Sequence, residues 1–178
     1  MDQVSVLSGL RAKLEADPGA IAETLAAECN VTLRQVIEAL PETMRRFAPG
    51  ECFVAVMEEL ATWGDVTVIL HSDDGVMEFT GPIPKGSIGR GYYNLAGSKG
   101  FHGHLRHDRC AGVAFVERPV FGRHSASIVF LNPAGSAMFK VFVGRDEKRE
   151  LLQDQLAAFR ALAKRFANHP AHSDGATN

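Results

Sequence analysis

Apolar side chains recur with two different periods along the chain, which divide it into a helical start, a strand-rich middle and a helical end. Leu7, Leu10 and Leu14 fall on one face of a helix by the 3.6-residue period. A later stretch, Cys52 to Trp63, carries a similar apolar stripe and is followed by Gly64, a residue suited to ending a helix. We predict a helix at each place.

Two further short helices are predicted between these stretches from their terminal residues. Asp17 is placed to cap a second helix, with Pro18 as its first residue. Thr32 and Gln35 have the spacing of a capping box, which predicts a third helix from Leu33 that ends before Pro41.

After Gly64 the pattern changes to short runs rich in Val, Ile and Phe, divided by turn signals such as Asp74-Gly75. Runs of this length with alternating polarity are typical of antiparallel strands joined by tight turns. The predicted strands are Asp65 to His71, Gly75 to Thr80, Gly100 to Arg106, Ala111 to Glu117, Ser125 to Leu131 and Ala137 to Val143.

A long helix is predicted to begin at Asp146, because Glu147 and Glu150 would then lie in its first turn, where negative charge is favoured. Residues 168–178 contain too few apolar side chains to be ordered by packing, and we predict a flexible tail there. The apolar stripe that would cover one sheet face is Leu152, Leu156, Phe159, Ala163 and Phe166.

These elements predict an α+β fold, in which short N-terminal helices precede a curved antiparallel β-sheet with a long C-terminal helix packed on it. The chain has 178 residues, of which 46% are hydrophobic and 22% charged, enough for one substantial core. We expect a single domain over residues 1–167, made of an N-terminal helical subregion (1–48) and a helix, sheet and C-terminal helix (49–167).

Several classes of protein are excluded by composition. No apolar run approaches the roughly 20 residues that a membrane-spanning helix needs. The first residues lack the features of a secretory signal, so we expect a cytoplasmic protein. Cys29, Cys52 and Cys110 are an odd number at wide spacing, which favours reduced thiols over a disulfide framework.

The order of the first helices resembles a DNA-binding helix-turn-helix, but the charge does not fit. Residues 1–62 hold ten acids and five bases, and a phosphate-contacting surface needs the opposite sign. We therefore expect no nucleic-acid partner, and interpret these helices as a packing or interaction module. Positive charge is concentrated between Lys85 and Arg145, a stretch that contains nine basic and two acidic residues.

Histidine is the main candidate for chemistry, because the common phosphate-loop, dinucleotide, nucleophile-elbow and zinc-protease motifs are missing from the sequence. In the strand from Asp65 to His71, alternation places His71 on the face opposite Val66, Val68 and Leu70.

The same rule applied to Gly100 to Arg106 puts His102, His104 and Arg106 on one face, provided that this segment is a strand. A face with imidazoles and a guanidinium is either solvated or receives a ligand with a metal and acceptor groups.

A haem suits these residues better than a bare metal ion. No carboxylate or thiol stands at short spacing to complete a tetrahedral site, and His107-x-x-Cys110 alone is a weak signal. Haem needs only one or two axial ligands, cations for its propionates and an apolar wall. Candidates for that wall, each also explained as ordinary core, are Tyr92, Tyr93, Phe101, Phe115, Phe121 and Phe130.

Several long segments in order resemble the haem-utilisation family called ChuX or HutX. They are WGDVTVILHS (63–72), GYYNLAG (91–97), the stretch from GFHGHLRHDRC to VFLN (100–132) and the stretch from GSAMFKVFVGRDEK to FRAL (135–162). With the short N-terminal helices, the resemblance covers nearly the whole chain. It implies the fold of ChuX and of one half of the larger HemS and ChuS haem proteins.

The resemblance also implies a site and a role. The family's two proposed haem-linked histidines correspond to His71 in VILHS and His104 in GHLR. Arg106, to which the family assigns no such role, is the nearest candidate cation for a propionate. His102 and His124 are not part of the family pattern. The implied protein is a non-enzymatic, cytosolic homodimer that binds b-type haem, carries or stores it after import and passes it to haem-using or haem-degrading proteins, with a haem importer or haem-degrading protein as partner. The alternative is a haem-degrading enzyme related to ChuS and HemS.

Overall fold

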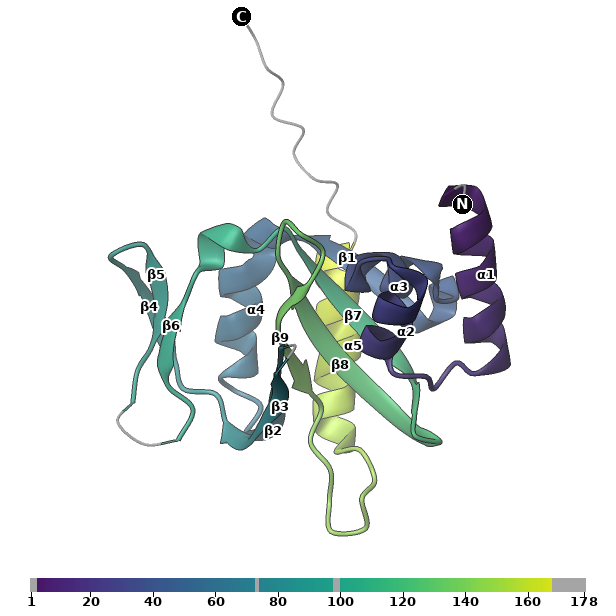
Figure 1. Ribbon diagram of the computed structural model, residues 1–178. Coiled ribbons are helices and arrows are strands. Elements are labelled where there is room, and N and C mark those ends of the chain that lie inside the picture. The colour runs from purple at the N-terminus through teal and green to yellow at the C-terminus, as the bar shows by residue number, and fades with distance from the viewer. Residues whose placement is uncertain (1–2, 73, 98–99, 168–178) are drawn as a thin grey trace, which may run out of the picture.

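The computed structural model describes residues 3–72, 74–97 and 100–167 (Figure 1). Within them, helices stand at both ends of the chain and strands fill the middle. Three short 3-10 turns, Glu42–Met44, Gly50–Cys52 and His107–Arg109, join neighbouring elements. The α-helices are α1 (Gln3–Ala16), α2 (Ala22–Cys29), α3 (Leu33–Ala39), α4 (Phe53–Leu60) and α5 (Gln153–Ala167).

The strands form two antiparallel sheets. The six-stranded sheet has the order β1-β7-β8-β9-β2-β3, and the three-stranded sheet has the order β4-β5-β6. Figure 1 shows β4–β6 and the helices α1–α3 on opposite sides of the molecule. The strands are β1 (Arg45–Pro49), β2 (Asp65–Ser72), β3 (Gly75–Pro82), β4 (Gly86–Gly89), β5 (Tyr92–Leu95), β6 (Gly103–Leu105), β7 (Gly112–Val120), β8 (Arg123–Leu131) and β9 (Ala137–Phe142).

Each face of the large sheet has its own hydrophobic core, because β7 and β8 are apolar on both faces. The larger core joins the sheet to α4, α5 and the small sheet, and includes Phe53, Phe130 and Phe159. The smaller core joins the opposite face to α1–α3, and includes Leu10 and Val36. The predicted α+β architecture, with the C-terminal helix on the sheet, is confirmed.

The small sheet is anchored to the larger core by Tyr93. Its ring is 1% exposed and meets Phe53 edge to face, with 5.7 Å between ring centroids. A side chain at Gly86 would stand 2.2 Å from the Tyr93 ring, so only glycine permits β4 to lie this close.

Helix α5 is fixed at its first turn by a buried amide. Gln155 is 3% exposed, and its Nε2 donates to the carbonyl oxygens of Trp63 and Asp65, at 2.8 and 2.9 Å. Its Oε1 accepts from the Gly144 backbone N–H at 2.8 Å. One side chain therefore joins α5 to the start of β2 and the end of β9.

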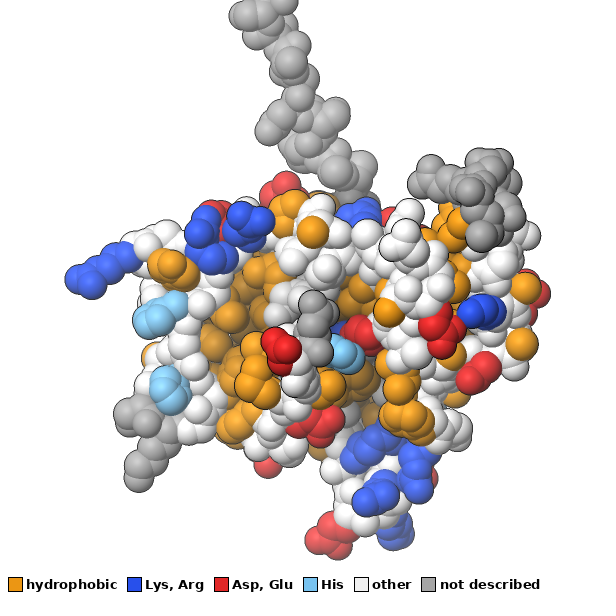
Figure 2. All heavy atoms as spheres, viewed as in Figure 1, with side chains coloured by type: hydrophobic (Ala, Val, Ile, Leu, Met, Phe, Trp, Pro, Cys, Tyr) orange, Lys and Arg blue, Asp and Glu red, His pale blue; other side chains and the backbone are white. Residues whose placement is uncertain are grey.

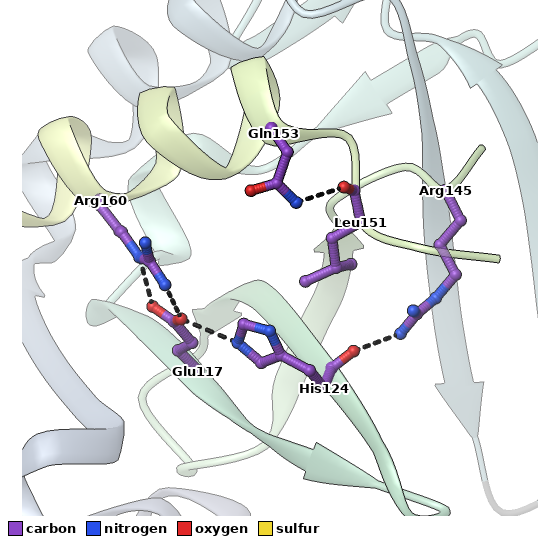
Figure 3. Close-up of polar contacts among 6 residues, drawn as sticks. All are labelled: Glu117, His124, Arg145, Leu151, Gln153 and Arg160. Carbon is purple, nitrogen blue, oxygen red and sulfur yellow. Dashed lines mark hydrogen bonds and ion pairs between the residues drawn. The ribbon is translucent and has the colours of Figure 1, made fainter. Parts of the chain in front are cut away.

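A polar cluster ties α5 to the β7–β8 hairpin (Figure 3). Arg160 donates to both carboxylate oxygens of Glu117, at 2.5 and 3.1 Å, and His124 lies 2.8 Å from the same carboxylate. Arg145 donates to the His124 carbonyl oxygen at 2.6 Å. The hydrogen bonds of Arg160 and His124 hold the pKa of Glu117 below its usual range, although burial acts in the opposite direction.

Two predicted helix starts are wrong, for one physical reason: each aspartate is satisfied by a local turn. Asp17 accepts from the Gly19 N–H at 2.9 Å, and α2 begins only at Ala22. Asp146 accepts from the backbone N–H groups of Lys148 and Glu150, both at 2.9 Å, and α5 begins at Gln153. By contrast, the Thr32–Gln35 capping box is present as predicted.

The predicted strands differ from the observed ones by shifted ends, as in β7, which continues to Val120, and by short strands that were not predicted. The predicted strand from Gly100 to Arg106 is reduced to β6, Gly103–Leu105. Strands β1, β4 and β5 were not predicted, since each has only four or five residues, too few to show a period in the sequence. None of the helices described here is long and apolar enough to cross a membrane. The predicted tail, 168–178, lies outside the described residues.

Candidate functional site

His71 lies near the end of β2, on the sheet face that carries α2. Alternation along β2 buries Val66 and Val68 on the other face and turns the His71 side chain, 33% exposed, toward the helix. Lys140 of β9 is paired with Ile69, two residues before His71, and so shares this face. The predicted placement of His71 opposite the two buried valines is confirmed.

A carboxylate from the N-terminal helices reaches this position. Glu23 Oε1 of α2 lies 3.8 Å from His71 Nδ1 and forms an ion pair with Lys140. Burial alone would raise the pKa of Glu23, but the charge and hydrogen bond of Lys140, together with a backbone hydrogen bond and the charge of His71, lower it overall. Glu23 is therefore a carboxylate at neutral pH, and it faces one ring nitrogen of His71.

His71 also borders a cleft of about 690 Å³ between α2 and the sheet. This volume falls within the range of small-molecule sites. The wall is mostly polar or small, and includes Thr32, Ser72 and Ser136 as well as Glu23. His71 therefore lies at an open cleft, whose shape depends on how α2 packs against the sheet.

His104 lies on β6 of the small sheet, directly opposite Asn94 of β5. The distance from His104 Nδ1 to Asn94 Oδ1 is 2.6 Å. Because the carboxamide oxygen can only accept, Nδ1 carries the hydrogen and Nε2 keeps the lone pair that an iron atom requires. The side chain is exposed, and Tyr92 meets the ring edge to face at 5.9 Å.

Arg106 follows β6 and is exposed, as the predicted shared face requires. Exposure alternates from Phe101 to Arg106, with His102, His104 and Arg106 outward. Arg106 already has a carboxylate partner, since it donates to both oxygens of Asp108 at 2.8 and 2.6 Å. Any propionate at Arg106 would have to compete with Asp108.

His71 and His104 belong to different sheets, so one chain does not gather them in a single cluster. Figure 2 shows imidazole groups over the β4–β6 sheet and beside the β2–β3 turn, with a hollowed, largely apolar surface between them. The partly buried apolar side chains that border the larger core include Leu70 of β2, Phe79 of β3 and Phe101 before β6. The rings of Phe79 and Phe101 stack with centroids 5.5 Å apart.

The remaining candidates from the sequence are the aromatic wall residues and the His107–Cys110 pair, and most of them lie in the hydrophobic core or in a turn. Of the proposed wall residues, Tyr93, Phe115 and Phe130 are core, and Phe121 stands on the β7–β8 turn. Burial raises the pKa of the Cys110 thiol to about 11, so it is a poor thiolate ligand beside His107. Throughout the described residues, no three His, Cys, Asp or Glu side chains are placed to hold a metal ion.

Three site residues were missed by the sequence analysis. Glu23, Asn94 and Lys140 touch or neighbour the two histidines, but they come from α2, β5 and β9. Local spacing carries no signal for Glu23 or Lys140, which are more than 45 positions from His71. Asn94 was visible only as part of the quoted GYYNLAG segment.

Comparisons with known proteins agree on one family. The family model for haem utilisation ChuX/HutX matches residues 46–162. The intracellular heme transport protein HutX of Vibrio cholerae is 40% identical over 150 residues, which cover 84% of this chain and 78% of that protein.

Two solved structures are similar over most of their length. A protein from Erwinia carotovora is 43% identical with a TM-score of 0.85, and the match covers 88% of this chain and 98% of that one. A structure described as the heme-binding protein ChuX is 38% identical with a TM-score of 0.80, covering 88% and 97%.

The fold is shared more widely than the sequence. ChuS, described as an E. coli heme oxygenase, is 18% identical with a TM-score of 0.67, and the match covers 78% of this chain and 42% of ChuS. This is a likeness of fold to part of a larger protein. The family match and the relatives of about 40% identity together place this chain in the ChuX/HutX family of haem-utilisation proteins.

Proposed function

We propose that this protein is a non-enzymatic, cytoplasmic haem carrier that binds b-type haem through His104 or His71. The observation that carries the proposal is the apolar, hollowed surface with imidazole groups on either side (Figure 2). An apolar macrocycle requires such a wall, and its iron requires a neutral imidazole nitrogen.

The resemblance to HutX and ChuX supports the same ligand, since those proteins are described as transporting or binding heme. Two features of this chain suit a carrier rather than a store. His104 is exposed, and Arg106 is shared with Asp108. Both would permit release, because an open site with a contested cation dissociates readily.

Hemin titration tests the proposal. We expect the wild-type protein to shift the Soret band of hemin, and His71→Ala or His104→Ala to weaken binding by about tenfold or more. His124→Ala is the matched control, because His124 is an exposed strand histidine held by Glu117. A spectrum identical to free hemin, or one unchanged when both His71 and His104 are replaced, contradicts the proposal.

A homodimer is part of the proposal. Strand β3 is the last strand of the large sheet, and its Val76 and Met77 side chains are 52% and 61% exposed. Unpaired apolar strand edges are prone to pair with a second copy. We expect light scattering to give twice the 19.3 kDa chain mass, and Met77→Lys to reduce it toward the monomer. A monomeric wild type overturns this part.

Haem degradation is the competing function, suggested by the fold that ChuS shares. Incubating the hemin complex with ascorbate and catalase in air separates the two. We expect the Soret band to persist, because a carrier returns its haem intact. A biliverdin-type product that forms despite catalase would instead identify an enzyme.

A further inference from the structure

Asn94 is in an unusual position for a surface amide, because both ends of its side chain are bound. The two N–H groups of its Nδ2 are shared among the carbonyl oxygens of Ser87, Gly89 and Tyr92, which lie at 3.2, 3.0 and 3.3 Å. These acceptors lie on β4, at its end and at the start of β5. They fix the amide so that only Oδ1 can face β6.

The oxygen that remains is bound to His104. Asn94 and His104 are cross-strand partners, and Oδ1 lies 2.6 Å from Nδ1. The ring is further restricted by Tyr92, whose own face carries the Arg106 guanidinium at 5.8 Å. The small sheet thus sets both which nitrogen of His104 is protonated and which direction the other nitrogen faces.

From these contacts we propose that Asn94 is a positioning residue for His104, and that it holds the imidazole as the Nδ1–H tautomer with Nε2 presented to haem iron. This inference rests on the proposed function. Partners of this kind fix the orientation of a ligating imidazole and raise its basicity, and losing one typically costs 10- to 100-fold in metal affinity.

The surroundings of the two histidines differ in charge. His71 faces the carboxylate of Glu23, whose charge is shared with Lys140, whereas His104 faces a neutral amide. A neutral amide oxygen fixes the tautomer but polarises the Nδ1–H bond less than a carboxylate would, so it raises the basicity of the ring less. Of the two histidines, His104 therefore has its ring orientation fixed before haem binds, while its Nε2 lone pair remains a moderate donor to iron. A protein that releases haem requires both properties.

Two substitutions separate positioning from a structural role, because Asn94 uses its two ends for different purposes. Asn94→Asp keeps an oxygen for His104 Nδ1–H but loses the N–H donors that bind the three carbonyl oxygens of the β4–β5 hairpin. Asn94→Ala loses both. A purely structural role predicts equal effects of the two variants, whereas positioning predicts that only Asn94→Ala changes His104.

The first measurement uses the protein without haem. The ¹⁵N shifts of the His104 ring report which of its two nitrogens carries the hydrogen, with His104→Ala providing the assignment. We expect Nδ1–H in wild type and Asn94→Asp, and a mixture in Asn94→Ala. Equal populations in both variants overturn the inference.

The second measurement is hemin affinity in a His71→Ala background, which leaves His104 as the candidate ligand. We expect Asn94→Ala to weaken hemin binding about tenfold or more and Asn94→Asp to stay within about threefold of the parent. If Asn94→Ala changes the His104 tautomer but leaves the hemin affinity unchanged, then Asn94 does not position His104 for iron binding. If the wild type does not bind hemin at all, the proposed function is wrong. The tautomer measurement would then still show whether Asn94 orients the His104 ring, but not for a haem ligand.

Discussion

At the scale of single residues, the tip of the β7–β8 hairpin holds a side chain that its backbone disfavours. Val120 and Arg123 are paired, so Phe121 and Gly122 form a two-residue turn, with φ of 49° and 72°. Both values are those of a type I′ turn, which favours asparagine followed by glycine. Phe121 is 77% exposed and gains little from burial.

We therefore expect Phe121→Asn to stabilise the protein by about 1 kcal/mol, because asparagine tolerates the left-handed region better than a bulky residue. Urea denaturation followed by circular dichroism measures the change. Gly122→Ala is the opposite control and should destabilise by a similar amount. A loss of stability in Phe121→Asn would mean that the aromatic ring makes a contact that outweighs the turn.

The candidate site shows how far single positions can be predicted. His71, His104 and Arg106 were proposed as site residues from alternation and, for the histidines, from the quoted family segments; the predicted faces of His71 and His104 are confirmed. Their partners could not be predicted, because the ion pair of Glu23 with Lys140 depends on how α2 docks against β9. The pairing of Asp108 with Arg106 spans only two residues, yet it forms only because the 3-10 turn follows β6.

At the scale of elements, most helices and the central strands of the large sheet were predicted. The errors are helix starts, where a local turn competes with the helix, and short strands. The period of apolar residues predicts the middle of an element, as in α4 and β2, because burying one face favours a single register. An aspartate near a helix start can cap the helix or close a turn, as Asp146 does, and spacing does not distinguish the two. Edge strands such as β4 escape prediction because they are short and only partly buried.

The attachment of α5 through Gln155 leads to a second prediction. Gln155→Leu fits the volume but leaves the N–H of Gly144 and the carbonyl oxygens of Trp63 and Asp65 without this partner. Each unsatisfied buried group costs about 1–3 kcal/mol, so we expect a loss of about 3 kcal/mol in the free energy of unfolding.

Gln153→Leu is the matched control, because Gln153 is exposed and donates a single bond to the Leu151 carbonyl (Figure 3). We expect its loss to stay below about 1 kcal/mol. Urea denaturation of both variants measures the difference. Equal losses would show that the Gln155 amide is not what holds α5 in place.

The Glu117 cluster predicts a dependence of stability on pH. The folded-state pKa of Glu117 is depressed, so its contribution is complete above the unfolded pKa of about 4.3 and is lost as the pH falls through the folded value. We expect Glu117→Gln to cost about 1 kcal/mol at pH 7 and progressively less below about pH 4.

Urea midpoints at pH 7, 5 and 3.5 test this expectation. Glu78→Gln, at an exposed position of β3, is the control and should change stability little at any of these values. A cost of Glu117→Gln that does not shrink in acid would assign the effect to packing rather than to the Arg160 and His124 bonds.

At the scale of the whole molecule, two cores share one sheet. β8 contributes Val129 and Leu131 to the core beneath α1–α3, and Ile128 and Phe130 to the core beneath α4 and α5. Adjacent residues of a single strand thus belong to opposite cores. Because β8 contributes to both cores, unfolding of this strand disrupts both of them. We therefore expect residues 1–167 to unfold as one cooperative unit, as a single domain would.

The only tryptophan, Trp63, packs against the core beneath α4 and α5, so its fluorescence reports that core, while circular dichroism reports the whole chain. Ile37→Ala creates a cavity on the other face of the sheet and should cost about 3 kcal/mol. We expect the transitions seen by Trp63 fluorescence and by circular dichroism to coincide, and both midpoints to move to a lower urea concentration. Ile128→Ala, in the same core as Trp63, is the control and should give the same result. If Ile37→Ala instead left the Trp63 transition in place while circular dichroism split into two steps, the N-terminal helices would unfold as a separate unit. The cleft beside His71 would then open without loss of the sheet that carries the histidine.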